Sequence, residues 1–499
     1  MKTTMNLKRT LLLLTLAGAV AGPCVWADDS TNDIQALKQQ IEQLDQKVRD
    51  LEHKQEQAAD DSAAKAKDQQ IQDLDQKVRV LERQRELDAE AADAKSKDAA
   101  KSIPVITAGA GGFSFRSADT NFVLALHGVL QADSRTFFKD GGAKGNDGFI
   151  LRRARPILQG TVFRDFDFLF VPDFGGTTVQ IFDASLNYRY RPELQVLAGK
   201  FKSPVGLESL QSDVNVLFNE RSLATDLVPN RDLGAELHGD FADGVVSYAA
   251  GIFDGATDYS GTTTNADYQD NKAFAGRLFF QPFKKTSVSA LQGFGFGVGG
   301  SYEVDRAWTN TASTGLTPGY TTDGQQKFFA YTNGVVGNGR HWRVSPQGYY
   351  YYGPLGVLGE YVISDQQIRN VTRGLSTDVH NTAWEISGGW VLTGEDASYS
   401  GVTPRHPFDP LNGYWGAFQV VGRYADLSID SSAFPNFANP ASSASEAKAW
   451  AAGLNWYLNR NIRVNTSFSR TTFTGGTGSG ATVTKQPENV FFTRIQLGF

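Results

Sequence analysis

The sequence predicts an all-β transmembrane barrel of about 16 antiparallel strands, preceded by an α-helical coiled-coil segment. Three observations support this prediction. Between Phe113 and Phe499, apolar and polar residues alternate with a period of two, as in strands with one apolar and one polar face. Residues 33–98 instead place apolar residues at alternating spacings of three and four, which is typical of a coiled coil. The first 27 residues have the pattern of an export signal.

The export signal covers residues 1–27. It has a basic start, an apolar stretch at 11–20 that is too short to span a membrane, and an A-x-A-like cleavage site at 25–27. The single cysteine, Cys24, precedes the cleavage point. We therefore expect a mature chain that has no cysteine and forms no disulfide.

Average composition does not by itself distinguish a barrel from a soluble protein. The chain is 40% hydrophobic with a mean hydropathy of −0.33, and a barrel has similar averages because every second strand residue faces water. The 51 glycines and 12% aromatic residues fit twisted strands with tight turns and aromatic girdles. Loss of three basic residues with the signal changes the net charge from −6 to −9. This total does not exclude an anion path, because permeation depends on the charges that line the lumen.

Residues 28–100 are expected to form a periplasmic coiled coil. This region contains a 30-residue repeat, so the apolar seam of the coiled coil occurs twice. The first copy consists of Ile34, Leu37, Ile41, Leu44, Val48 and Leu51, and the second of Ile71, Leu74, Val78 and Leu81. Thirty residues are four heptads plus two, so the seam must break near residues 58–66. A single solvated helix and a disordered linker are the alternatives, and the spacing leaves open whether the coiled coil is a dimer or a trimer.

After a linker at residues 101–115, the barrel is expected to occupy residues 116–499. One expected strand face carries Phe182, Ala184, Leu186, Tyr188 and Tyr190. The last strand carries Phe491, Ile495, Leu497 and Phe499 on one face, with Arg494 and Gln496 on the other. Such a strand, ending on an aromatic residue, is typical of the closing strand of a bacterial outer-membrane barrel. At roughly 24 residues per strand the length predicts about 16 strands, enough to enclose an aqueous channel.

Several arginines lie opposite the apolar faces of the expected strands: Arg153, Arg155, Arg277, Arg423, Arg463 and Arg494. An arginine that faces lipid at mid-membrane costs roughly 2–4 kcal/mol, so the lumen is the cheaper position. Guanidinium groups in a lumen select anions, because their fixed charge and N–H donors replace the water that the anion loses. The alternative is that they lie at the rim and contact lipopolysaccharide or pair with aspartates.

The chain resembles the phosphate-selective porin O/P family over roughly its last 390 residues. The resemblance rests on the final strand and on Leu151–Arg155, Gly199–Lys202, Gly206–Glu208, Asn219–Arg221 and Gly453–Tyr457. It implies a homotrimer of 16-stranded barrels in the bacterial outer membrane, with loops folded into each lumen. Such a channel would pass phosphate, polyphosphate and other small anions, and its outer wall would contact lipid and lipopolysaccharide.

The resemblance also implies site residues. In the family, an R-R-A segment supplies two arginines that contact phosphate, and these carry over to Arg152 and Arg153; the aromatic residue that follows there is Arg155 here. With the charges derived above, the expected lining of the anion path comprises Arg152, Arg153, Arg155, Lys200, Lys202, Ser212, Arg277, Arg423, Arg463 and Arg494.

Two departures from the family pattern introduce carboxylates. Family members place a basic residue and two serines after Gly-Leu-Glu, where this chain has Ser209, Ser212 and Asp213. Asp167 stands where a lysine is expected. We therefore expect an anion-preferring channel with weakened phosphate selectivity.

Three other functions have weaker support in the sequence. Tyr349–Tyr352 would suit a porin for organic anions or sugars, although interfacial girdle tyrosines are the favoured interpretation. The coiled coil would suit a structural tether of the envelope. An enzyme is disfavoured, because the six histidines have no metal-binding spacing and no nucleophile elbow is present. We expect no catalytic residue, metal or cofactor, and no nucleic-acid partner.

Overall fold

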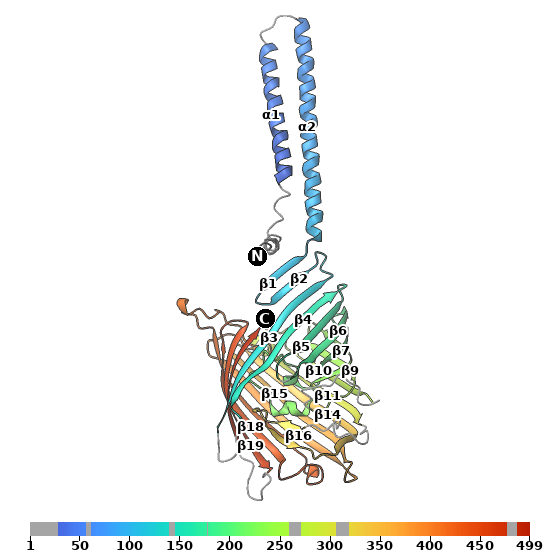
Figure 1. Cartoon of the computed structure of the whole chain (residues 1–499), viewed down its shortest axis with the longest axis vertical. Coiled ribbons are helices and arrows are strands. Elements are labelled where there is room, and N and C mark those ends of the chain that lie inside the picture. Colours follow the sequence, from blue (N-terminus) through green and yellow to red (C-terminus); the bar gives the residue numbers. More distant parts are fainter. Residues whose placement is uncertain are drawn as a thin grey trace, which may run out of the picture. The chain divides into compact units, whose positions relative to one another are not determined.

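The computed structural model describes residues 28–55, 61–138, 145–176, 178–258, 271–305, 319–476 and 487–499. The expected signal peptide lies outside the described residues. The chain forms two compact units, Met1–Ile103 and Pro104–Phe499 (Figure 1). None of the helices in the described part of the chain has both the length and the apolar character needed to cross a membrane.

The first unit contains two helices in contact with each other, α1 (Asp28–Gln55) and α2 (Asp61–Ser102) (Figure 1). Half-buried side chains recur along both helices at the spacing expected from the heptads: Leu37, Ile41, Leu44 and Val48 in α1, and Ile71, Leu74, Val78 and Leu81 in α2. These side chains are less exposed than their neighbours, so the two copies of the repeat supply the two helices of one pair. The chain leaves the first helix near the expected break of the seam.

The segment expected as a linker instead contains a β-hairpin of β1 (Val105–Gly109) and β2 (Gly112–Arg116). Its turn requires glycine, because Gly112 has a φ of +91° and a Cβ there would lie 2.5 Å from the carbonyl oxygen of Leu126. Residues 109–112 therefore form a tight turn within the segment that was expected to be a linker. β2 pairs with the first four residues of β3, so the hairpin extends the sheet of the second unit.

Sixteen antiparallel strands of the second unit close into a barrel, as predicted (Figure 1). Each strand pairs with the next, and β20 pairs with β3 to complete the circle. The strands are β3 (Val123–Phe138), β4 (Gly148–Val162), β5 (Phe166–Asp173), β6 (Gln180–Arg191), β7 (Leu194–Lys202), β8 (Arg231–Phe241), β9 (Val246–Phe253), β10 (Ala273–Phe280), β11 (Phe294–Asp305), β14 (Val335–Tyr352), β15 (Leu355–Asn370), β16 (Leu375–Val391), β17 (Ala417–Ser428), β18 (Ala444–Tyr457), β19 (Ile462–Gly475) and β20 (Glu488–Gly498).

The expected alternation determines which side chains face out. In β3 the apolar Leu126 and Leu130 are exposed, whereas Gln131, Asp133 and Arg135 are buried. In β20 the exposed Phe491 and Ile495 alternate with buried residues in the same way. An apolar outer face suits lipid, and the polar inner face lines the lumen.

In the described part of the chain, several connections between strands enter the lumen, and three of them position the residues discussed below. Residues 203–230 join β7 to β8 and contain α3 (Leu207–Leu210) and the 3₁₀ turn η1 (Leu223–Leu227). Residues 319–334, which precede β14, contain β12 (Gly319–Thr321) and β13 (Lys327–Ala330). Residues 392–416 enter from the opposite end of the barrel, where β3 begins and β20 ends; we call this end the turn end. There the Tyr399 hydroxyl donates to the Leu207 carbonyl oxygen at 2.6 Å.

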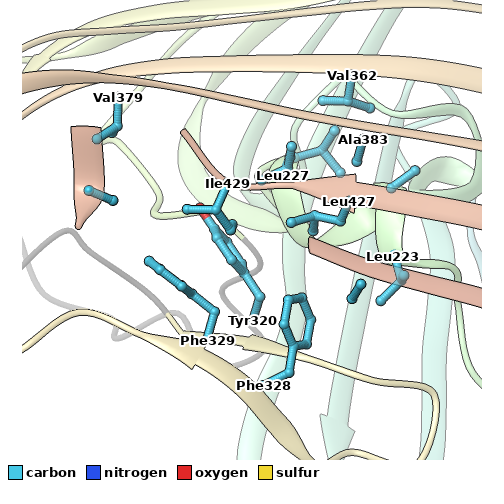
Figure 2. Close-up of a cluster of buried hydrophobic side chains, with 14 of the residues drawn as sticks. Leu223, Leu227, Tyr320, Phe328, Phe329, Val362, Val379, Ala383, Leu427 and Ile429 are labelled. Atoms are coloured by element: carbon cyan, nitrogen blue, oxygen red, sulfur yellow. The ribbon is translucent and has the colours of Figure 1, made fainter. Parts of the chain in front are cut away.

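The second of these segments fills one side of the lumen with apolar side chains (Figure 2). Tyr320, Phe328 and Phe329 belong to the same buried cluster as Leu223 and Leu227 of the β7–β8 connection. Inward-facing residues of the wall complete the cluster: Val362, Val379, Ala383 and Leu427. Because these side chains fill the β15–β17 side of the lumen, the polar cavities described below lie along the β3–β10 part of the wall.

Candidate functional site

A cavity of about 430 Å³ lies between strands β3–β6 and the inward segment 203–230. Its lining contains six arginines and three carboxylates: Arg135, Arg152, Arg153, Arg155, Arg221, Arg231, Asp173, Asp213 and Glu220. A fourth carboxylate, Asp183, pairs with Arg231 from outside this lining at 3.0 Å. Even with Asp183 included, positive charges exceed negative charges by two.

A β-bulge in β4 brings consecutive arginines into this cavity. Gln131 of β3 pairs with Arg153, and the next residue of β3, Ala132, pairs with Leu151. Arg152 therefore has no partner residue in β3. Strict alternation would direct Arg152 to the lipid side. The extra residue in the bulge instead allows Arg152, Arg153 and Arg155 all to line the lumen.

Two carboxylates of the inward segment hold the arginines. Glu220 accepts hydrogen bonds from Arg152 Nε at 2.6 Å and Arg152 Nη2 at 2.9 Å, and from Arg135 Nη2 at 3.2 Å. Asp213 accepts a hydrogen bond from Arg155 Nη1 and pairs with Arg153 Nε at 3.4 Å. Arg221, from the same segment as Asp213, donates to its other oxygen. These ion pairs fasten the segment to the barrel wall.

Both carboxylates remain charged beside these arginines. Burial alone would raise the pKa of the Asp213 carboxyl, but Arg153, Arg221 and Arg155 hold this pKa well below its ordinary value. Burial is likewise overcome at Glu220, where mainly Arg152 lowers the pKa. At neutral pH each carboxylate is therefore a fixed negative charge within the arginine cluster.

The cluster retains unused hydrogen-bond donors. The Nε atoms of Arg135 and Arg153 are buried and make no hydrogen bond to the described residues, although Arg153 Nε lies 3.4 Å from Asp213 Oδ2. A buried donor that lacks an acceptor costs about 1–3 kcal/mol. An acceptor oxygen that reaches these atoms would remove this cost.

Phe182 orients two of the arginines. It was expected on the outer face with Leu186, but the register passes from Val171↔Asp183 to Pro172↔Ile181 and leaves Phe182 unpaired in a second bulge. Its ring consequently lines the cavity. The guanidinium carbons of Arg155 and Arg231 lie 3.7 and 4.0 Å from the ring centroid, so the ring stacks on both groups. Stacking on the faces of the guanidinium groups leaves their edges available for hydrogen bonds.

A second cavity of about 550 Å³ extends toward the turn end and shares Arg231 with the first. Three predicted site residues line it: Lys202, Ser212 and Arg277. Lys202 Nζ donates to the Gln211 carbonyl oxygen at 2.8 Å, and Arg277 Nε donates to Gln347 Oε1 at 2.9 Å. The lining also contains Asp183, Glu236 and Asp240, so the excess of positive charge is confined to the first cavity.

Three of the predicted arginines line neither cavity and instead form structural hydrogen bonds. Arg494 of β20 makes two hydrogen bonds to Asp133 of β3, at 2.6 and 2.7 Å. Arg423 donates to Asp323 of the 319–334 segment at 2.8 Å, and Arg463 donates to the carbonyl oxygen of Val216 at 3.1 Å. They hold the barrel seam and the inward segments in place.

Lys200 also lines neither cavity. It breaks the pattern of β7, because Val196 and Ala198 are exposed whereas Lys200 is buried. Conversely, Arg135, Arg221 and Arg231 line the first cavity although they were not among the predicted site residues. The alternation in β3 predicts that Arg135 faces the lumen, like Gln131 and Asp133. No periodicity indicates where Arg221 or Arg231 points, because these residues lie within or beside the inward connection.

Replacing Arg494 with Ala should destabilise the barrel by about 3–5 kcal/mol, because Asp133 would remain buried without its cationic partner. Urea unfolding in detergent measures this loss. The double variant Asp133→Asn, Arg494→Gln should lose less stability than R494A, because it leaves no unpaired charge. Equal stability of R494A and the unmodified protein would show that the pair does not stabilise the seam.

Comparison with known proteins places this geometry in context. The family model for phosphate-selective porin O and P matches residues 124–499. Porin O of Pseudomonas aeruginosa is 25% identical over 390 residues, which cover 72% of this chain and 85% of that protein. Among solved structures, the outer-membrane channel DcaP of Acinetobacter baumannii is 11% identical with a TM-score of 0.48 and covers 77% of this chain and 99% of that one. An anion-selective porin from Comamonas acidovorans is 10% identical with a TM-score of 0.45, covering 76% and 100%.

Proposed function

We propose that this chain, which belongs to the phosphate-selective porin O and P family, passes small anions through its arginine-lined lumen. Phosphate or polyphosphate is the proposed substrate. As a porin of the outer membrane it is a channel for small solutes and not an enzyme. The observation that carries the proposal is the excess of arginines over carboxylates in the cavity between β4 and the inward segment.

The route runs through the two cavities. An anion that enters the first cavity exchanges water for guanidinium N–H groups, including the unused Nε donors of Arg135 and Arg153. Arg231 lines both cavities and would pass the anion on toward Arg277 and Lys202. Because the arginines are held by Phe182 and by fixed carboxylates, they need little reorganisation when an anion arrives.

The carboxylates limit how tightly the anion is held. Asp213 already occupies the space among Arg153, Arg155 and Arg221 that an anion would favour. Its charge competes with the permeating anion, which weakens binding. Weakened binding favours conduction, since an anion must be attracted into its site and must also be able to leave it.

A planar-bilayer measurement of the reversal potential in a KCl gradient tests the proposed selectivity. We expect a potential of the sign that chloride permeation produces, because the excess of arginines attracts chloride and repels potassium. A potential of the opposite sign would show a cation channel and end the proposal. Titration of phosphate into the same bilayer then measures its block of the chloride current.

The alternative of an aromatic path for sugars has less support. Tyr349 stacks on Tyr399 with ring centroids 5.4 Å apart, and it also contacts Phe279. Tyr351 packs against the buried residues around Val391. Neither tyrosine lines the two cavities described above. These rings pack against residues of the connection 392–416, so a sugar path along them is disfavoured.

Deletion of residues 28–100 separates transport from a tethering role. The barrel has its own buried core and its own closed sheet, so the shortened protein should keep its single-channel conductance and its phosphate block. Loss of envelope integrity with unchanged conductance would assign the tether to the helices. Loss of conductance in a correctly inserted barrel would contradict the division of roles. The proposed homotrimer is tested on the same sample by its mass in detergent.

A further inference from the structure

Three glutamates meet where the inward segment touches the wall, away from the arginine cavity. Glu208 belongs to α3, Glu360 to β15 and Glu385 to β16. All three are buried, with 3–4% of their surface exposed. Their carboxylates each offer an oxygen atom that lies within 4.8 Å of the other two.

Two of the glutamates have donors from the inward segment. Glu360 accepts the backbone N–H groups of Leu207 at 2.8 Å and Glu208 at 3.1 Å. The Glu208 carboxylate accepts the N–H of Ser222 at 2.8 Å. These bonds position the two carboxylates but do not supply a full positive charge.

In the described part of the chain, the third glutamate has only the Glu208 carboxyl group beside it as a possible hydrogen-bond donor. Both Oε atoms of Glu385 are buried and make no hydrogen bond to the described residues. Burying a polar group without a partner is unfavourable, and burying a charge is more so. Since Glu385 contributes one of the converging oxygens, its unsatisfied carboxylate is directed into the cluster.

Charges nearby do not balance the cluster. Arg423 Nη1 lies 3.5 Å from Glu208 Oε1, but the same guanidinium binds Asp323 more closely, at 2.8 Å. Arg423 therefore divides its charge between Glu208 and Asp323. Arg277, which also attracts Glu360, donates its Nε–H to Gln347. The cluster lacks positive charge where the arginine cavity has an excess of it.

We propose that Glu208, Glu360 and Glu385 bind a divalent cation, calcium, which links the inward segment to the barrel wall. The ligands are all carboxylate oxygens, which hard cations prefer. Calcium, with ligand distances of roughly 2.3–2.6 Å, can reach oxygens up to about 5 Å apart, whereas magnesium at about 2.0–2.1 Å reaches only about 4 Å. The bound ion would neutralise Glu385 and join α3 to β15 and β16, fixing the segment that forms one wall of both cavities.

Calcium retention by the full chain in lipopolysaccharide-free detergent tests the site. After removal of free metal, the unmodified protein should retain one more calcium ion per chain than Glu385→Gln. The matched control is Glu236→Gln, because Glu236 of β8 is also buried, with an oxygen lacking a donor, yet lies outside the cluster. This control should retain as much calcium as the unmodified protein. Equal retention by E385Q and the unmodified protein would overturn the proposal.

A second measurement does not depend on the folding of a variant. The unfolding temperature of the barrel is measured as the temperature at which heating changes its mobility on a gel. Chelation should lower this temperature for the unmodified protein, and added calcium should restore it. The reason is that a ligand that binds only the folded state stabilises that state. E236Q should respond in the same way, and E385Q should not respond. If the unmodified protein neither retains calcium nor responds to it at millimolar concentration, a proton shared between Glu385 and Glu208 neutralises the cluster and the proposal is wrong.

Discussion

Replacing Asp213 with Asn should tighten phosphate binding in the lumen about tenfold or more. The change removes the negative charge that contacts Arg153, Arg155 and Arg221 and leaves a side chain of similar size. A tenfold gain corresponds to about 1.4 kcal/mol, well under the roughly 4 kcal/mol expected for two charges 4 Å apart at an intermediate dielectric. The measured quantity is the phosphate concentration that halves the chloride conductance, which should fall.

Asp243→Asn is the matched control for this prediction. Asp243 pairs with Lys285 in an exposed turn, so the same change of charge occurs far from the cavity. Its half-blocking concentration should equal that of the unmodified protein. If D213N folds with normal heat-modified mobility and its half-blocking concentration does not fall, then Asp213 does not compete with the permeating anion.

Replacing Arg152 and Arg153 together with Ala should raise the half-blocking phosphate concentration at least tenfold. The double variant removes two of the six arginines that line the first cavity, and one of them carries an unused buried donor. A hydrogen bond to a charged group contributes about 1.5–3 kcal/mol, so the loss of one such bond is sufficient for this effect. The bilayer titration described for Asp213 measures the change.

The control for the arginine pair is Arg164→Ala with Arg189→Ala. These arginines lie at the turn end and are largely exposed, in contact with Asp165 and Asp167. Removing them changes the net charge by the same amount but leaves the cavity lining intact. Phosphate block that is equal in R152A/R153A and in this control would exclude Arg152 and Arg153 from the binding site.

Much of the barrel follows from its sequence because alternation is a local property. The outward side chains of Leu126 and Leu130, and the inward side chains of Arg153, Arg155 and Arg494, are as the pattern predicts. The number of strands agrees with the expectation from length, and β20 pairs with β3 as a closing strand does. Arg152 became a site candidate through its resemblance to a family motif, since alternation alone predicts the wrong face for it.

The remaining features depend on contacts that no local pattern encodes. Glu220 pairs with Arg152 although 68 residues separate them, and this pairing follows from how the inward segment folds. Alternation and charge together identified Arg423 and Arg463 as lumen residues, but whether each faces water or binds an inward segment depends on the path of that segment. The bulge that turns Phe182 inward is likewise a matter of register between two strands, which the sequence of one strand does not specify.

The bulge in β4 has a consequence for how channels of this kind can diverge. Because Arg152 occupies an extra position, deletion of that single codon would restore a regular ladder while leaving Arg153 and Arg155 on the same face. The channel would lose one cationic group without any other side chain changing sides. Gain or loss of one residue in a strand therefore offers an evolutionary route to a new ion preference that keeps the rest of the wall unchanged.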